Sequence, residues 1–307
     1  MTYARAKVWL DGTLVAAGEA RASVLSHAMQ RGSLVFDVGA LRPGSRGPVL
    51  FRPREHIARF MRSAALVGLQ VPWSEDTLLR ATHEAARSSG TTSGLVRWSA
   101  YIPSPEVDVV PRGDAPTSVA IAVIAPDGTH GAPPVAKAVA RVMVPSDVRK
   151  AGPEVFPPEA KAAASYLGPM LAKRRALAAG FDEVVLLDGE GHVAEAPTAN
   201  VFVVRGGTLA TPPLGRVLPG ITRASVIAIA EAEGIPVREE LFGLAGMESA
   251  DEAFLVATSL PVQAVASVNG KVLPGGAPGP VTARIKEVFV RCERGDDPRF
   301  AQWTEYV

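Results

Sequence analysis

Apolar and polar residues alternate in patterns that predict strands and helices in turn along the first 125 residues. The opening segment, KVWLDGTLVAAG, has two β-prone runs on either side of Asp11-Gly12, a dipeptide suited to a tight turn, and it predicts a β-hairpin. Pro53 precedes apolar residues at helical spacing, and Gly68 is suited to end that helix. Ser74 is suited to cap the next helix, after which TSGLVRWSAYI and TSVAIAVIA have strand composition.

The same two patterns continue beyond residue 136. They predict helices over 163–179 and 222–233, and strands over 183–188, 192–196, 200–205, 253–257 and 262–268. Gly206-Gly207 and Asn269-Gly270 are typical of hairpin turns, and Gly234 is suited to end the second helix. Helices and strands that follow one another in this way indicate an α/β or mixed α+β fold.

A single stretch without periodicity separates the two patterned parts. PDGTHGAPPVA, residues 126–136, is rich in proline and glycine, which is typical of an interdomain connection. A chain of 307 residues also exceeds the size at which one hydrophobic core usually keeps growing. We therefore expect a small N-terminal α/β domain over 1–125, a linker over 126–136 and a larger C-terminal domain over 137–307.

Composition narrows the classes of function. With 47% apolar and 21% charged residues the chain is globular, and 32 basic against 31 acidic residues give a net charge of +1. This balance favours neither a nucleic acid nor an anionic membrane as partner. We find no signal peptide and no membrane span, so the default location is the cytoplasm. The single cysteine, Cys292, excludes an internal disulfide.

Few residues stand out as candidates for chemistry. The sequence has no paired-cysteine or HExxH metal motif, no GxSxG elbow and no glycine-rich nucleotide loop, so no metal is predicted. Lys161, one of only seven lysines, can act as a nucleophilic amine but also fits a surface lysine at a helix start. Pro219-Gly220 precedes a helix whose free N–H groups can hold a phosphate or can simply be capped. Glu195 fits either a buried acceptor or a solvated strand end.

Four segments, taken in order, resemble the class IV pyridoxal-phosphate aminotransferase family. They are LFRPREHIARFMRSAALVGL, EAKAAASYLGPMLAKRRALAAGFDEVVLLDGEGHVAEAPTANVFVV, LPGITRASVIAIAEAEGI and ADEAFLVATS. The resemblance runs from about Val8 to the C-terminus and is closest to branched-chain amino acid aminotransferases. It implies the two-domain fold type IV of D-amino acid aminotransferases, mixed α/β in content, which binds pyridoxal 5′-phosphate in the cleft between the domains.

The resemblance also implies roles for individual residues. Lys161 is implied as the catalytic residue, which forms the Schiff base to the cofactor and moves the substrate's proton. Glu195 is implied to pair with the pyridine nitrogen, and Tyr166 to hydrogen-bond the ring oxygen. The cofactor phosphate is implied to be held by an arginine, a helix N-terminus and a threonine, namely Arg54, Gly220, Ile221, Thr222 and Thr258.

The substrate pocket departs from the branched-chain pattern. Its implied residues are Arg31, Phe36, Leu95, Arg97 and Ser259. Branched-chain enzymes usually have a tyrosine where this chain has Arg31 or Leu95, and a glutamate-glycine pair where it has Asp37-Val38. Arg31 is considered as a partner of Asp37, and the run RGSLVFDV resembles (R)-selective amine transaminases. Arg97 instead suits an amino acid or keto acid, because a guanidinium binds a carboxylate.

These observations predict an enzyme that transfers an amino group between an amino acid, with branched-chain L-amino acids favoured, and a 2-oxo acid by a ping-pong mechanism. The family implies a homodimer whose pocket is built by two subunits. A D-amino acid or (R)-amine transaminase is the alternative, and an aminodeoxychorismate lyase is a further one. A binding protein that has lost its chemistry is disfavoured, because a fold alone does not require Lys161, Tyr166, Glu195 and Arg54 together.

Overall fold

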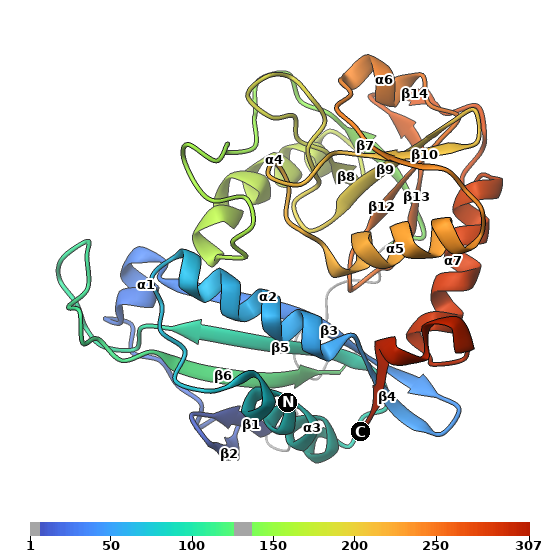
Figure 1. Cartoon of the computed structure of the whole chain (residues 1–307). Helices are drawn as coiled ribbons and strands as arrows, with labels where there is room; N and C mark the ends of the chain where they lie inside the picture. The colour runs from blue at the N-terminus through green and yellow to red at the C-terminus, as the bar shows by residue number, and fades with distance from the viewer. Residues whose placement is uncertain (1–6, 126–136) are drawn as a thin grey trace. The chain divides into compact units, whose positions relative to one another are not determined.

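The computed structural model describes residues 7–125 and 137–307, and the chain forms two compact units (Figure 1). Unit 1 contains Met1–Pro134, Ala160–Ala164 and Cys292–Val307, and unit 2 contains Val135–Glu159 and Ser165–Arg291. The expected linker, 126–136, lies outside the described residues. The expected domains differ from these units because two later segments of the chain belong to unit 1.

Unit 1 is built on a seven-stranded sheet in which every pair of neighbours is antiparallel. In sheet order the strands are β15 (Thr304–Tyr306), β4 (Gly47–Phe51), β3 (Leu34–Gly44), β5 (Gly94–Tyr101), β6 (Ser118–Ile124), β1 (Lys7–Leu10) and β2 (Thr13–Ala16). The predicted hairpin at Asp11-Gly12 is confirmed, with φ of 46° and 102° at its two turn residues. Positive φ angles are what such a turn needs.

Two helices cover this sheet, α2 (Pro53–Leu66) and α3 (Glu75–Ser89). Helix α1 (His27–Arg31) and the 3-10 helix η3 (Pro298–Trp303) are shorter. Helix α2 packs on β3 and β5, and α3 on β6 and β1 (Figure 1). Both helices start where the sequence predicts, with Pro53 in the first turn of α2 and the Ser74 hydroxyl accepting from the Thr77 N–H of α3. Their apolar sides fill the core around Phe60, Leu78 and Trp98.

Unit 2 contains a mixed eight-stranded sheet. Its strands, in sheet order, are β11 (Val237–Glu239), β10 (Thr208–Thr211), β9 (Asn200–Arg205), β12 (Glu252–Val256), β13 (Gln263–Val268), β7 (Val139–Met143) and β8 (Glu183–Val184), with β14 (Lys271–Val272) paired to β13. Its helices are α4 (Leu167–Ala178), which follows the 3-10 helix η2 (Ala163–Tyr166), then α5 (Ile221–Ala232), α6 (Leu244–Glu248) and α7 (Pro280–Glu293). Central strands buried on both faces form the core, where the rings of Phe202 and Phe254 stack at 5.2 Å.

A later segment of the chain, which contains Lys161, joins the unit 1 sheet. The Phe36 N–H donates to the Lys161 carbonyl at 3.0 Å, and Val35 forms an antiparallel bridge with Ala162. The Lys161 N–H donates to the Ser63 hydroxyl of α2 at 3.1 Å. Lys161 therefore has a backbone fixed by strand β3 and helix α2, although the sequence places it about 100 residues later.

Candidate functional site

In unit 1, Lys161 lies beside an aromatic ring and a second cation. Its Nζ is 5.1 Å from the centre of the Phe36 ring, and the Arg97 guanidinium is 4.1 Å from the same centre. Arg97 is paired with Val38, which lies two residues after Phe36 on strand β3, so Phe36 and Arg97 point to one face of the sheet. The two predicted substrate residues therefore lie together, next to the predicted catalytic amine.

The opposite face of strand β3 carries a buried charge cluster. The Asp37 carboxylate has no exposed surface and accepts from Arg59 Nε at 2.7 Å, from Arg59 Nη2 at 2.8 Å and from His56 Nδ1 at 2.7 Å. Burial by itself raises the pKa of Asp37, but the charges and hydrogen bonds of Arg59 and His56 hold it well below its usual range. Burial lowers the pKa of His56 despite the carboxylate, so this histidine is neutral near pH 7.

This cluster corrects one interpretation of the sequence. Arg31 does not pair with Asp37, because Arg31 is exposed and donates to the carbonyls of Gln30 and Val107 at 3.1 and 3.3 Å. The sites that a guanidinium would need on Asp37 are taken by Arg59 and His56. The pairing of Arg31 with Asp37 rests on charge alone. In the structure the buried Asp37 carboxylate pairs with Arg59 of α2, which is also buried.

The surroundings of Arg54 do not support the phosphate role predicted for it. Its side chain is 62% exposed and is engaged by Glu305 at 2.9 Å and Asp76 at 3.5 Å. Arg59, five residues later, is buried on the face of α2 that also carries His56 and Ser63. That face contacts strand β3 and the backbone of Lys161. Arg59 is therefore the arginine of α2 that lies next to the Lys161 segment, and its helical spacing from Ser63 is the signal that could have identified it.

The remaining pocket residue predicted in unit 1 is Leu95, which is opposite Ala40 on strand β3 and is partly exposed. Leu95 shares its strand and its sheet face with Arg97, two residues on. Arg31 lies on α1, which the Ser26 side chain caps and which ends at Gly32 in the left-handed conformation, with φ of 76°. Leu95 therefore belongs with Phe36 and Arg97, whereas Arg31 donates to the carbonyls of Gln30 and Val107.

In unit 2, Glu195 is held by three donors. Its Oε1 is 3.1 Å from Lys150 Nζ, and its Oε2 accepts from the Leu218 N–H at 3.0 Å and from Asn200 Nδ2 at 3.3 Å. The Glu195 side chain is 17% exposed. Lys150 and Asn200 were missed in the sequence, and Glu195 proves to be a partly buried acceptor rather than a solvated strand end.

The N-terminus of α5 lies close to this carboxylate. Asn200 also donates to the Leu218 carbonyl at 3.0 Å, and a side chain on Gly220 would collide with the Asn200 amide oxygen. Gly220 is the N-cap residue of α5, and as a glycine it has no side chain to cap this end. Ile221 and Thr222 in its first turn are buried. The first N–H groups of such a terminus suit an anion such as a phosphate.

Thr258 and Ser259 follow the end of strand β12, where Val256 pairs with Asn200. A tight turn, closed by the Ala257 N–H to the Leu260 carbonyl at 3.3 Å, holds both hydroxyl residues. Asn200 pairs with Val256 before this turn and also donates to the Leu218 carbonyl before α5. The turn and the N-terminus of α5 therefore lie at the same end of the unit 2 sheet. Tyr166 ends the short helix η2 and begins α4, five residues after Lys161. Unit 2 thus gathers Glu195, Gly220, Ile221, Thr222 and Thr258.

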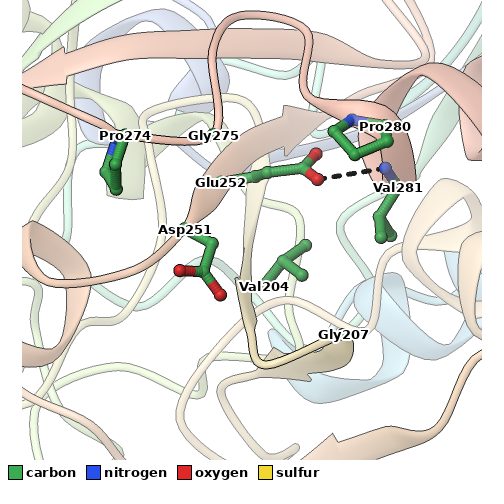
Figure 2. A pocket seen from close by; sticks show the side chains of 8 residues that line it. All are labelled: Val204, Gly207, Asp251, Glu252, Pro274, Gly275, Pro280 and Val281. Carbon is green, nitrogen blue, oxygen red and sulfur yellow. Dashed lines mark hydrogen bonds between the residues drawn. The ribbon is translucent and has the colours of Figure 1, made fainter.

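A pocket in unit 2 has a different lining (Figure 2). Its volume is about 380 Å³, and it is lined by Val204, Gly207, Asp251, Glu252, Pro274, Gly275, Pro280 and Val281. There the Glu252 carboxylate accepts from the Val281 and Thr282 N–H groups at 3.0 and 2.8 Å, which caps α7. The Glu252 carboxylate is thus engaged by helix α7, and no predicted site residue is among the residues that line this pocket.

Among residues 7–125 and 137–307, no three His, Cys, Asp or Glu side chains are grouped so that they could hold a metal ion. Over the same ranges, every helix is too short or too polar to cross a membrane.

Comparison with known proteins identifies the family. Residues 35–268 match the family model described as amino-transferase class IV. The branched-chain-amino-acid aminotransferase of Escherichia coli K12 is 32% identical over 301 residues, covering 98% of this chain and 97% of the relative. The fold and site thus define an aminotransferase, and the chain belongs to the class IV aminotransferase family.

Solved structures agree over the whole length. A branched-chain aminotransferase from Thermoproteus uzoniensis, determined with norvaline, has a TM-score of 0.90 and 36% identity, with 98% of each chain covered. The branched-chain enzyme from Thermobaculum terrenum, determined in its pyridoxal-phosphate holo form, has a TM-score of 0.90 and 26% identity, with 99% of this chain and 98% of that chain covered. The predicted family, class IV fold and transaminase activity are therefore confirmed, and the predicted cofactor agrees with the holo form of this relative.

The buried cluster leads to a stability prediction. We expect Asp37→Asn to lower the free energy of unfolding by about 3–5 kcal/mol, because it leaves the buried Arg59 charge without its carboxylate. The matched control is Asp76→Asn, which removes an exposed partner of an arginine on the same helix and should change the free energy by less than about 1 kcal/mol. Urea denaturation followed by tryptophan fluorescence measures both, and equal losses would contradict the assignment.

Proposed function

We propose that this class IV aminotransferase binds pyridoxal 5′-phosphate and transfers the amino group of branched-chain L-amino acids to a 2-oxo acid. The observation that carries the proposal is the position of the Lys161 amine over the Phe36 ring, beside the Arg97 guanidinium. Similarity over nearly the whole chain to branched-chain enzymes supports the substrate class. The structures of the named relatives hold norvaline in one case and pyridoxal phosphate in the other, which are ligands of this chemistry.

The residues of unit 2 fit the cofactor. A pyridine nitrogen that carries a proton needs a fixed anionic acceptor, and Glu195 is such an acceptor. A phosphate needs N–H donors, which the first turn of α5 offers at Ile221 and Thr222. Thr258 adds a hydroxyl at the same end of the sheet. Tyr166 is retained as the partner of the ring oxygen.

The cofactor supplies an aldehyde that combines with amines and a ring that withdraws electrons from the substrate. Lys161 supplies the chain's own amine, which binds the cofactor and then carries a proton at Nζ to and from the substrate carbon. Contact with Phe36 keeps this amine on one face of the sheet. Arg59, in place of Arg54, supplies the fixed guanidinium for the phosphate, because Asp37 holds it in one orientation.

On the substrate side, an arginine beside an aromatic ring suits a molecule with one carboxylate and one apolar group. Arg97 would bind the carboxylate, and Phe36 and Leu95 would contact the apolar side chain. Ser259 lies in the exposed turn after β12 and is retained as a further hydrogen-bonding group. Arg31, exposed and bonded to the Val107 carbonyl, would act only at the rim of such a pocket.

A homodimer is part of the proposal, and an exposed apolar patch supports it. The patch comprises Val24, Leu25, Met29, Val107, Val109 and Val110, each between 62% and 93% exposed. Its two segments are held together, since His27 Nε2 is 3.1 Å from the Val109 carbonyl and Arg31 donates to that of Val107. A contiguous apolar patch on a chain of this size favours contact with a second copy.

The proposal includes a cytoplasmic location, which cell fractionation would test. The single cysteine, which cannot form an internal disulfide, agrees with this location.

The substrate class is tested by the amino donors that the holoenzyme accepts. Cofactor-loaded protein mixed with L-leucine should convert its bound cofactor to pyridoxamine phosphate, seen as a change in the visible and near-ultraviolet spectrum. L-Glutamate, D-alanine and (R)-phenylethylamine are the comparison donors. Conversion by D-alanine or the (R)-amine alone would overturn the branched-chain assignment. Lys161→Ala is the control: if borohydride still fixed the cofactor to the same peptide in this variant, the assignment of Lys161 would be wrong.

Substitution of each arginine of α2 distinguishes their roles in cofactor binding. Arg59→Lys keeps a positive charge beside Asp37 but removes the planar fork, so we expect at least a tenfold loss of pyridoxal-phosphate affinity, about the value of one charge-assisted hydrogen bond. Arg54→Lys is the matched control and should leave the affinity unchanged within about twofold, because an exposed ion pair contributes little. Cofactor titration by fluorescence quenching measures both. A larger loss in Arg54→Lys would restore the original assignment.

The apolar patch is tested by a charge placed within it. Val109→Asp introduces a carboxylate at a side chain that is 72% exposed in the single chain. We expect the wild-type protein to sediment as a dimer and this variant to shift toward the monomer at micromolar concentration, because a buried unpaired charge is costly in an interface. Sedimentation velocity gives the result. A wild-type protein that sediments as a monomer would contradict the dimer.

A further inference from the structure

Lys150 lies in unit 2 and contacts the oxygen of Glu195 that neither Asn200 nor Leu218 contacts. Its Nζ is 3.1 Å from Glu195 Oε1, and the two side chains are only 15% and 17% exposed. Asn200 and Leu218 both donate to Oε2. The carboxylate is therefore fixed from two directions, by neutral donors on one oxygen and by a full positive charge on the other.

The backbone holds this pair as firmly as its side chains do. The Lys150 N–H donates to the Leu187 carbonyl at 2.8 Å, while the Leu186 N–H donates to the Glu195 carbonyl at 3.0 Å. Three extended segments thus lie side by side, with residues 186–187 in the middle. Lys150 and Glu195 reach across the middle segment, so their contact follows from the path of the chain and needs no unusual side-chain geometry.

A largely buried ion pair needs an explanation beyond stability. Removing both charges from water costs free energy that their attraction often only offsets, so such pairs contribute little to folding. Glu195 also has neutral donors, which already satisfy one of its oxygens. A lysine carries a compact point charge at the end of a flexible chain, rather than the planar fork of an arginine. This makes Lys150 suited to setting the electrostatics of Glu195 without occupying both of its oxygens.

We propose that Lys150 is a positioning residue that acts through Glu195 on the pyridine nitrogen of the cofactor. It holds the carboxylate in one orientation, and its charge weakens the attraction of that carboxylate for the proton on the ring. The ring nitrogen then releases its proton at a lower pH than Glu195 alone would set. The inference rests on the proposed function, since it assumes that Glu195 faces the pyridine nitrogen.

The test is a titration of the ring nitrogen in holoenzyme loaded with pyridoxal phosphate that carries ¹⁵N in the ring. The ¹⁵N chemical shift reports directly whether this nitrogen is protonated. We expect Lys150→Met to raise the titration midpoint by about one pH unit, a tenfold change in proton affinity, because a positive charge nearby is lost. Lys150→Arg should restore the wild-type midpoint, since it restores the charge.

Two further variants complete the test. Lys173→Met is the matched control, because Lys173 pairs with Glu183 at 2.6 Å elsewhere in unit 2, and it should leave the midpoint unchanged. Lys150→Gln keeps a donor without charge, so it should behave like Lys150→Met, and it provides a second neutral variant should Lys150→Met fold poorly. A wild-type midpoint in both neutral variants, or failure of Lys150→Arg to restore it, would overturn the inference.

Failure of the proposed function is recognised separately. Before any titration, wild-type holoenzyme is reduced with borohydride and the modified peptide is identified. If no adduct forms on Lys161, the proposed function is wrong and this inference falls with it. If the adduct is present but the neutral variants titrate like the wild type, the proposed function stands and only the role of Lys150 is rejected.

Discussion

A carboxylate with no exposed surface, Asp37, is the constraint on which the first half of this protein depends. A buried negative charge must be matched, and Asp37 is matched by three hydrogen bonds from Arg59 and His56. Those bonds require α2 to lie on strand β3 in a single rotational setting. The same setting places the Ser63 hydroxyl where it accepts from the Lys161 N–H. One buried acid thereby fixes a helix, an arginine and the segment that carries Lys161.

The space around this acid is equally restricted. Trp98 lies opposite Asp37 on strand β5, with its ring stacked on His56 at 6.0 Å and its Nε1 donating to Thr82 at 2.8 Å. A Cβ on Gly39 would approach the Trp98 ring to 2.7 Å, so this strand position has room only for a glycine. Packing and electrostatics therefore support the same arrangement, because the ring that fills the space above Gly39 also excludes water from the charges.

Local signals in the sequence were sufficient for elements whose ends are set by local chemistry. The hairpin at Asp11-Gly12, the cap at Ser74 and the start of α5 after Gly220 all lie where they were predicted. Predictions were less accurate where pairing is long-range: the strand expected over 192–196 forms only isolated bridges. Strand β15 and the Lys161 segment join the sheet of unit 1 from positions late in the chain, which no periodicity reveals. Arg54 and Arg59 differ in burial for a similar reason: motif order selects the helix, and the helical spacing of Arg59 from Ser63 indicates the buried arginine only once the packed face of α2 is known.

The charged groups of the candidate site are held in two different ways, by ion pairs and by an aromatic contact. Arg59 and Glu195 each face an opposite charge, Asp37 or Lys150, so their orientation is set before any ligand binds. The Lys161 amine also lies over the ring of Phe36. An aromatic face attracts a cation by only about 0.5–2 kcal/mol. The Phe36 ring therefore places this amine beside Arg97 on one face of strand β3, whereas the ion pairs fix the orientation of Arg59 and Glu195.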